Sequence, residues 1–343
     1  NDYTAEMAQQ RREFVTSRTG TSLQHVGSFT LDPAQVAGNI ENFLGVAQVP
    51  VGLAGPLRIN GEHATGDFYI PLATTEGTLV ASYNRGMRLL SESGGVTVTV
   101  VKRAMQRAPV FEFASAREAR DFGQWLVEHG DAIRAAAEAT TRIGKLTDVE
   151  QYAVGNLLYT RFNYTTGDAA GQNMTGKATL AACEWIKAQH PLHPGYILSG
   201  SIDTDKKHSA INTLRTRGRR VIAEVTIRNE TNGIAAMFIA TGQDVANVAE
   251  SHAGITYAQL LENGDYYWSV TLPSLIVASY GGGTGLGTQR ECLEMLGCYG
   301  DGKADRLAEI VAAVVLAGDV SLGSAVLAGD WVSSHDKLGR NRP

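Results

Sequence analysis

Apolar and polar positions alternate along the chain in patterns that predict mixed helices and strands, an α+β fold. Near the N-terminus, residues 4–18 read as an amphipathic helix that ends before Gly20, and Asp32-Pro33 begins a second short helix. The stretch 41–57 is apolar but punctuated by proline and glycine, which predicts an ordered, packed loop.

A strand and a helix are expected after this loop. Residues 66–72 read as a strand, and a helix should start near Thr75, with Glu76 in its first turn. The apolar face of that helix holds Leu79, Val80, Tyr83, Met87 and Leu90.

Between residues 109 and 198 the pattern changes to strand, helix, helix, strand, strand, helix and strand. Ser115 and Glu118 form a capping box, residues 155–164 alternate as a strand, and residues 169–188 form a long helix. We expect this segment to fold as a compact α+β insert, a small domain within a larger one.

The flanking segments, 1–108 and 199–343, would form one large discontinuous domain. After the insert, the pattern predicts a strand over 219–227 and then a helix of small residues that carries Asp244. A strand pair that turns at Asn263-Gly264 and two further helices lead to the C-terminal tail.

The composition narrows the class of protein. A chain of 343 residues with 43% hydrophobic and 19% charged residues can bury a large core. Its formal net charge of −5 argues against a broad basic surface for nucleic acid.

The first residues lack the apolar region of a signal peptide, and no apolar run reaches the length of about 18 residues that a membrane span needs. The start at Asn1 rather than Met indicates processing or excision from a longer protein, and whether a membrane anchor preceded it stays open.

Cysteine usage points to a reducing compartment. Cys183, Cys292 and Cys298 form neither a CxxC pair nor a zinc-ligand spacing, and their number is odd. We expect them to be packing residues of a cytoplasmic protein with no bound metal.

Four ionisable side chains stand alone in apolar or small-residue runs, namely Glu76, Lys206, Asp244 and His335. A lone charge in a buried segment loses its solvation unless it meets a partner, so we expect these groups to meet one another. An acid, an ammonium, a carboxylate and an imidazole together can drive proton-coupled chemistry. A solvated turn around Lys206 and a surface position for His335 are the plainer alternatives.

Two glycine-rich motifs could hold a phosphate or a carboxamide. GGGTGLG (281–287) lies between an apolar strand and a helix, but it does not fit GxGxxG and is equally typical of a tight structural turn. GQNMTGKAT (171–179) nearly spells a phosphate-binding P-loop around Lys177. Ala178 stands where a hydroxyl must bind magnesium, which weakens the hypothesis of a P-loop phosphotransferase without removing it.

Seven ordered motifs resemble those of one family over nearly the whole chain. They are ENFLGVAQVPVGLAGPL (41–57), PLATTEGTLVASYNRG (71–86), TGDAAGQNMTGKAT (166–179), DTDKK (203–207), ATGQDVANV (240–248), LPSLIVASYGGGTGLGTQRECLEMLG (272–297) and SSHDKLGR (333–340). Together they resemble the catalytic domain of the class I 3-hydroxy-3-methylglutaryl-CoA (HMG-CoA) reductases, the biosynthetic branch that uses NADPH.

The resemblance implies a fold and a reaction. The insert 109–198 would be a ferredoxin-like NADP-binding small domain, set into a large substrate-binding domain and joined to it through DTDKK. The reaction would be the NADPH-dependent four-electron reduction of HMG-CoA to mevalonate and CoA, in isoprenoid biosynthesis. The family builds its active sites between two subunits, so we expect a homodimer or a larger homo-oligomer, with no nucleic-acid partner and no membrane contact from this chain.

The same resemblance assigns roles to the four ionisable residues. Hydride attack on a thioester develops an oxyanion, and Lys206, which matches the family's catalytic lysine, is suited to stabilise it. Asp244 would keep this lysine charged and share hydrogen bonds with Glu76. Glu76 would donate a proton to the aldehyde-level oxygen, and His335 would protonate the departing CoA thiolate.

Further positions match binding residues of the family. The cofactor positions are Arg142, Asp168, Gly171, Asn173, Met174, Gly282, Gly283 and Thr284. The substrate positions are Ser82, Asn84, Arg85, Arg107, Ser199 and Asn232. A guanidinium near the adenosine phosphate, as Arg142 would provide, suits NADP because it forms charge-assisted hydrogen bonds.

The chain departs from the family pattern in one segment. Between the strand that ends at Ile227 and Asn232, the family carries a longer segment with a second lysine for the substrate's carboxylate, where this chain has only RNET. If this shortening is natural, carboxylate binding is in doubt, and Arg107 could compensate in part. The alternative function is therefore a catalytically weak or silent homologue that binds CoA or NADPH.

Overall fold

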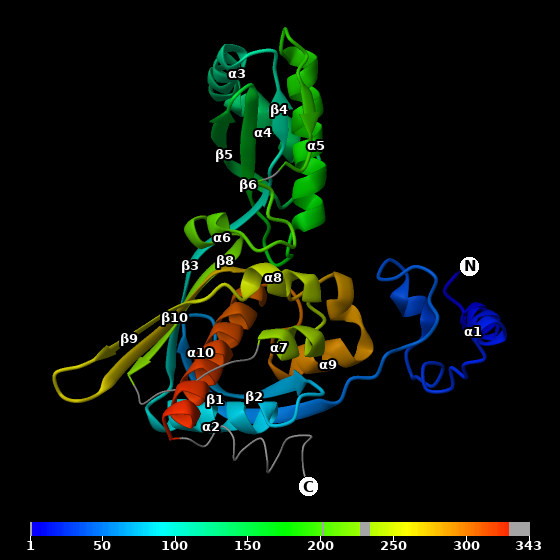
Figure 1. The fold of residues 1–343 in the computed structure, drawn as a ribbon, viewed down its shortest axis with the longest axis vertical. Coiled ribbons are helices and arrows are strands. Elements are labelled where there is room, and N and C mark those ends of the chain that lie inside the picture. Colours follow the sequence, from blue (N-terminus) through cyan, green and yellow to red (C-terminus); the bar gives the residue numbers. More distant parts are fainter. Residues whose placement is uncertain (1, 201, 227–233, 329–343) are drawn as a thin grey trace.

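The computed structural model describes residues 2–200, 202–226 and 234–328 (Figure 1). Its elements, in chain order, are α1 (Ala5–Thr19), η1 (Pro33–Val36), β1 (Val51–Gly61), β2 (Thr65–Ala73), α2 (Leu79–Glu92), β3 (Val96–Arg107), β4 (Val110–Glu112), α3 (Ala116–Glu128), α4 (Gly130–Glu138), β5 (Lys145–Val154), β6 (Leu157–Thr165), α5 (Gln172–Gln189), β7 (Gly195–Ile197), α6 (Ala210–Leu214), β8 (Gly218–Thr226), α7 (Ile234–Ala240), η2 (Val245–Asn247), α8 (Val248–Ser251), β9 (Ile255–Leu260), β10 (Tyr266–Leu275), η3 (Gly282–Gly285), α9 (Gly287–Met295) and α10 (Ala304–Ala328).

The strands follow the order β7-β4-β6-β3-β8-β10-β9, with β5 beside β6 and β1 beside both β2 and β3. Strand β3 joins the two parts of this arrangement. Its first part pairs with β1 and β8, whereas its last residues, 105–107, pair with β6. In Figure 1 the part built on β4 to β7 projects away from the part that holds α10, along the longest axis of the molecule.

Each part has a hydrophobic core of its own. In the larger part, α10 is buried on all sides over residues 307–317, where Glu309 is the one charged residue, and it packs against α2, β3 and β8. In the smaller part, residues of α3, α4 and α5 pack on Phe111, Leu158 and Phe162 of the strands. The core of the smaller part is thus separate from that of the larger part.

Most predicted elements are confirmed. The smaller part has the predicted order β4, α3, α4, β5, β6, α5 and β7. Ser115 accepts a hydrogen bond from the backbone of Glu118 at 3.3 Å and so caps α3. The helix predicted over 4–18 is α1, although only Ala8 of it is buried, so its predicted apolar face is absent. Among the cysteines, Cys183 is buried in the smaller core, as a packing residue should be.

Two local predictions are wrong. Glu76 does not lie in a helical turn, because Thr78 has a left-handed backbone (φ 76°) and α2 begins only at Leu79. Asp244 does not lie in a helix of small residues either. Gly242, at φ 69°, follows the end of α7, and Asp244 instead caps the short helix η2.

The packed loop predicted over 41–57 is also partly wrong, because residues from Val51 onward form β1. Pairing with β2 over the register Val51↔Ala73 to Asn60↔Thr65 overrides the glycine and proline punctuation. The sequence analysis also predicted no strand where β3 lies. Among the described residues, every helix is too short or too polar to cross a membrane.

Candidate active site

The structure brings Lys206 and Asp244 together at the junction of the two parts. The Nζ of Lys206, in the loop between β7 and α6, lies 2.8 Å from Oδ2 of Asp244. The other carboxylate oxygen of Asp244 accepts a hydrogen bond from the backbone of Ala246 at 3.0 Å, which fixes the carboxylate at the start of η2. Among the described residues, Asp244 is therefore the partner of the ammonium.

Both side chains remain partly open to solvent, with exposed fractions of 49% for Lys206 and 43% for Asp244. The hydrogen bond from Lys206 to Asp244 raises the pKa of the lysine, against a smaller opposing effect of burial. Lys206 is therefore an accessible ammonium that stays protonated at neutral pH, as a group that stabilises an oxyanion must be.

A buried charge network lies beneath this pair. Arg217, with 1% of its side chain exposed, donates to Glu250 at 3.0 Å and to Asp205 at 2.8 Å. Glu250 is fully buried and also accepts a hydrogen bond from the backbone of Lys206. Burial raises the pKa of Glu250 despite Arg217. Burial also opposes the charge of Asp205, but Arg217 and Arg107 outweigh it and lower the pKa of Asp205.

Arg107, a predicted substrate residue, is held by the same loop. It lies 3.0 Å from Asp203 and 3.4 Å from Asp205. Its second terminal nitrogen also approaches the backbone oxygen of Gln172 at 3.4 Å. In this structure Arg107 neutralises two carboxylates, so a substrate carboxylate would have to compete with them.

The first predicted cofactor motif, GQNMTGKAT (171–179), meets this loop at the start of α5. The side-chain nitrogen of Gln172 donates to Asp205 at 2.9 Å and to Asn247 at 2.8 Å, and so connects the helix with both sides of the Lys206–Asp244 pair. Gly171 precedes α5 with φ 84° and leaves the helix start without a side-chain cap. The first amide groups of α5 are therefore suited to an anion or a carboxamide.

Met174, in the first turn of α5, packs against the loop that carries Arg142. Its sulfur accepts a hydrogen bond from Thr141 at 3.2 Å, and a Cβ at Gly144 would lie 2.9 Å from the Met174 methyl group. Arg142 and Asn173 are both exposed. The loop thus holds an accessible guanidinium next to the first cofactor motif.

The second predicted cofactor motif, GGGTGLG (281–287), packs against the loop that carries Asp244. A Cβ at Gly283 would lie 2.9 Å from the carbonyl oxygen of Gly242, so only glycine allows the two loops to approach this closely. Gly282 is left-handed (φ 56°), and the buried Thr284 donates to the carbonyl of Gly281 at 2.7 Å. Both cofactor motifs therefore flank the Lys206–Asp244 pair.

Asp168 has a structural partner in this arrangement. Its carboxylate accepts hydrogen bonds from the backbone of Gly302 at 2.7 Å and of Ala304 at 3.4 Å, at the start of α10. A carboxylate at a helix N-terminus is favoured by the helix dipole. Asp168 thus joins the turn before α5 to the central helix of the larger part.

Glu76 is not part of the observed pair. It is exposed in the loop before α2, where its backbone donates to Thr74 at 3.0 Å. Within the described residues it forms no hydrogen bond or ion pair with Lys206 or Asp244. His335 and Asn232 lie outside the described residues.

The remaining substrate positions lie in two places, on α2 and in the chain just after β7. On α2, Ser82 lies 2.8 Å from the Ser321 hydroxyl, Asn84 accepts from Gly55 at 2.7 Å, and Arg85 donates to the Ser321 carbonyl at 3.2 Å. These contacts fix α2 against α10 and β1. Ser199 is exposed just after β7.

The P-loop alternative does not fit this geometry. Residues from Gln172 onward are helical, and the backbone of Thr175 already donates to Gly171 at 2.9 Å. A P-loop needs those amides free in a loop that surrounds the phosphates. Lys177 is an exposed residue of α5 instead.

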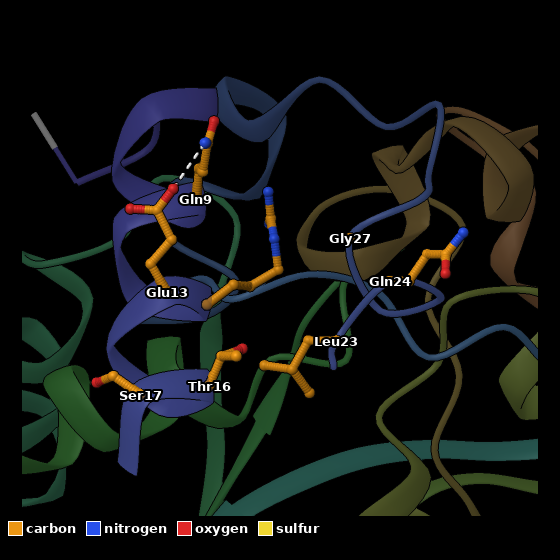
Figure 2. Close-up of a pocket in the computed structure, with 8 residues that line it drawn as sticks. Gln9, Glu13, Thr16, Ser17, Leu23, Gln24 and Gly27 are labelled. Carbon is orange, nitrogen blue, oxygen red and sulfur yellow. Dashed lines mark hydrogen bonds between the residues drawn. The ribbon is translucent and has the colours of Figure 1, made fainter. Parts of the chain in front are cut away.

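Two other places can be set aside as the reaction site. Glu62, His63 and Glu309 have ligand atoms within 4.8 Å of one another, but Glu309 already accepts backbone hydrogen bonds from the turn at 62–64. The other is a surface groove beside α1 (Figure 2). It is lined by Gln9, Arg12, Glu13, Thr16, Ser17, Leu23, Gln24 and Gly27. None of the predicted site residues lines it.

Comparison with known proteins identifies the family. A sequence profile described as Hydroxymethylglutaryl-coenzyme A reductase matches residues 7–231 and 228–340. The 3-hydroxy-3-methylglutaryl-coenzyme A reductase of Methanothermobacter thermautotrophicus is 41% identical over 369 residues, which cover 96% of this chain and 92% of the relative. That of Aeropyrum pernix is 42% identical over 98% of this chain and 90% of the relative. Reductase 1 of Arabidopsis thaliana is 37% identical over 96% of this chain and 63% of its own length.

The same fold occurs in a solved bacterial enzyme. The class II 3-hydroxy-3-methylglutaryl-CoA reductase of Streptococcus pneumoniae, bound to NADPH in open conformations, superposes with a TM-score of 0.72 at 19% identity, over 93% of this chain and 86% of that one. The higher identity to archaeal and plant enzymes agrees with the class I resemblance.

The shortened segment is visible in these comparisons. The profile matches in two separate segments, which meet and overlap at residues 228–231. The alignment with the Methanothermobacter enzyme runs over 369 positions, whereas 96% of 343 residues is about 329, so about 40 positions have no counterpart here. Even so, the matches extend over almost the whole chain. The chain therefore belongs to the hydroxymethylglutaryl-coenzyme A reductase family.

Proposed function

We propose that this chain catalyses the NADPH-dependent reduction of HMG-CoA to mevalonate and CoA, a step of isoprenoid biosynthesis. Family membership supports the reaction. The observation that carries the site is the 2.8 Å contact of Lys206 with Asp244, placed between the two glycine motifs. Relatives matched over about nine-tenths of their length are named as reductases, which favours an enzyme over a silent homologue.

The part that spans 109–198 is proposed to be the ferredoxin-like NADP-binding domain, and segments 1–108 and 199–343 the substrate domain. The start of α5 at Gly171 has no side-chain cap and Gly282 is left-handed, so both motifs could present backbone amides to a dinucleotide. Arg142 would bind the adenosine phosphate through charge-assisted hydrogen bonds. Bound NADPH would supply the hydride for each of the two reduction steps.

Lys206 acts on the carbonyl oxygen of the substrate. The ammonium stabilises the negative charge that develops there, and Asp244 keeps it protonated and directed. Glu76 would protonate the aldehyde-level oxygen after the loop before α2 approaches the pair. His335 would protonate the CoA thiolate as it leaves.

Substrate and assembly complete the proposal. HMG-CoA would be contacted by the substrate positions Ser82, Asn84, Arg85, Arg107, Ser199 and Asn232. A homodimer would complete each site with residues from two subunits. Ser199 and Arg107 lie on the two connections between the parts, where a ligand could contact both.

The test is the absorbance of NADPH with and without HMG-CoA. We expect consumption only with the thioester present and about two NADPH per CoA released. Lys206→Ala should remove turnover and leave the unfolding temperature unchanged, because an exposed lysine contributes little to stability. Binding of NADPH without consumption would instead support the silent homologue.

A further inference from the structure

The backbone of Lys206 has an unusual conformation. Its φ is 57°, in the left-handed region that residues with a Cβ enter only when their surroundings hold them there. This conformation sets the direction in which the side chain leaves the loop. The contact with Asp244 therefore depends on whatever holds the backbone.

Glu250 is the group that holds it. One carboxylate oxygen accepts the hydrogen bond of the Lys206 backbone N–H, and the other accepts from Arg217 at 3.0 Å. The Glu250 side chain has no exposed surface, and that of Arg217 has only 1%. A buried carboxylate with both oxygens engaged has little freedom to move, so it gives the Lys206 amide a fixed acceptor.

Glu250 and Asp244 belong to one continuous segment. Asp244 caps η2, which leads directly into α8, and α8 carries Glu250. Lys206 is thus attached to this segment at two points, through its backbone to Glu250 and through its ammonium to Asp244. Two attachments to the same short segment define both the position and the direction of the lysine.

We propose that Glu250 is a positioning residue of the reaction, which keeps Lys206 in its working conformation by accepting the hydrogen bond of the Lys206 backbone N–H. The inference rests on the proposed role of Lys206 in the reductase. It adds Glu250, supported by Arg217, to the residues on which turnover depends, although Glu250 is buried beneath the site and does not reach the substrate.

A matched pair of substitutions isolates the hydrogen bond. Glu250→Gln and Glu250→Met both remove the charge and preserve the size of the side chain, but only glutamine retains an oxygen that can accept from the Lys206 N–H. The control pair is Glu309→Gln and Glu309→Met, at another fully buried carboxylate that accepts backbone hydrogen bonds far from Lys206 along the chain.

Two readouts separate positioning from general destabilisation. The first is kcat for HMG-CoA with NADPH, together with KM for both. The second needs no activity: a limiting amine-acylating reagent is applied, and the labelling of Lys206 relative to its neighbour Lys207 is quantified by mass spectrometry. Lys207 is exposed, and within the described part of the chain its ammonium donates to the backbone of Asp205, so it serves as an internal reference.

We expect kcat of Glu250→Met to fall about 100-fold below that of Glu250→Gln, the loss typical of a misplaced catalytic group. KM should change little. The Lys206 to Lys207 labelling ratio should be at least about 3-fold higher in Glu250→Met than in Glu250→Gln, as when the pKa of a lysine falls by half a unit. The two Glu309 variants should match each other in kcat and in labelling.

An unchanged labelling ratio in Glu250→Met, or equal kcat values for the two Glu250 variants, would overturn the proposal. So would a kcat of Glu309→Met that falls as far below that of Glu309→Gln as is expected for the Glu250 pair. If Glu250→Met does not fold, Glu250→Ser replaces it, because its side chain is too short to reach the Lys206 amide and leaves room for water beside Arg217. Absence of thioester-dependent NADPH oxidation in the unmodified protein would refute the proposed function instead, and the labelling ratio would still test Glu250.

Discussion

Replacement of Gly86 by alanine tests the packing that holds α2, with its proposed substrate residues, against the core. A Cβ at Gly86 would lie 1.9 Å from the carbonyl oxygen and 2.8 Å from the carbonyl carbon of Ala317 in α10. Both atoms belong to the backbone of a buried helix and cannot turn aside as a side chain could. The two helices would have to separate.

The size of the effect follows from two opposing contributions. Alanine gains about 1 kcal/mol over glycine inside a helix. An extra methyl group forced into a packed core costs about 1–3 kcal/mol, and contact with backbone places Gly86→Ala at or above the upper end of that range. We therefore expect a net loss of about 2 kcal/mol, or about 4–8 °C in the unfolding temperature of a domain of about 250 residues.

The assay is thermal unfolding followed by circular dichroism, with kcat/KM for HMG-CoA measured on the same protein. The activity should fall as well, because Ser82, Asn84 and Arg85 lie on the displaced helix. Gly130→Ala is the control, since its Cβ at the start of α4 would meet nothing within 4 Å. A Gly86→Ala protein as stable as Gly130→Ala would refute this account of the helix packing.

Three further outcomes are expected. In Asp244→Asn, the alkaline limb of the kcat profile should move to lower pH, because the hydrogen bond to Asp244 is the main cause of the raised pKa of Lys206; an unmoved limb would contradict the pairing. Burial opposes the charge of Asp305, but hydrogen bonds from two arginines outweigh it and lower the pKa of Asp305. The ionised carboxylate therefore stabilises the fold above the ordinary pKa of 3.8. This stability is lost as the pH falls through the lower pKa of the folded protein. Urea unfolding of Asp305→Asn should therefore show a loss at pH 7 that shrinks toward pH 3, and a constant difference would argue against it. Gln172→Leu removes two side-chain hydrogen bonds to the loops around the lysine and should weaken NADPH binding about 10-fold in a fluorescence titration; unchanged affinity would exclude a role in cofactor binding.

Parts of the site could be predicted from local sequence. Asp244 stands out because an isolated charge among small or apolar residues needs a partner, and Lys206 stands out because DTDKK resembles a motif of the family. The helices and strands of 109–198 follow from periodicity and from the Ser115 cap, which depend on near neighbours. These signals act over a few residues, so a single sequence contains them.

Other parts could not be predicted in this way. Glu250 lies in VAESHAG, which reads as an ordinary solvated helix end, and its partner Arg217 is 33 residues away. Gln172 resembles any polar residue at a helix start until the loops of Asp205 and Asn247 are in place. The left-handed Thr78 likewise depends on the packing of α2 rather than on its own preference, which is why the start of that helix was misplaced.

The two covalent connections of the smaller part run side by side. The end of β3 and the chain after β7 are joined by the hydrogen bond from Gly200 to Ala108 at 2.8 Å and by the ion pair of Arg107 with Asp203. These contacts hold the two connections together, and Lys206 lies only three residues beyond Asp203 on one of them. If the smaller part binds the dinucleotide as proposed, a movement of this part on binding or release would also displace the segment that carries Lys206, and the path of the chain would then couple cofactor exchange to the position of the lysine.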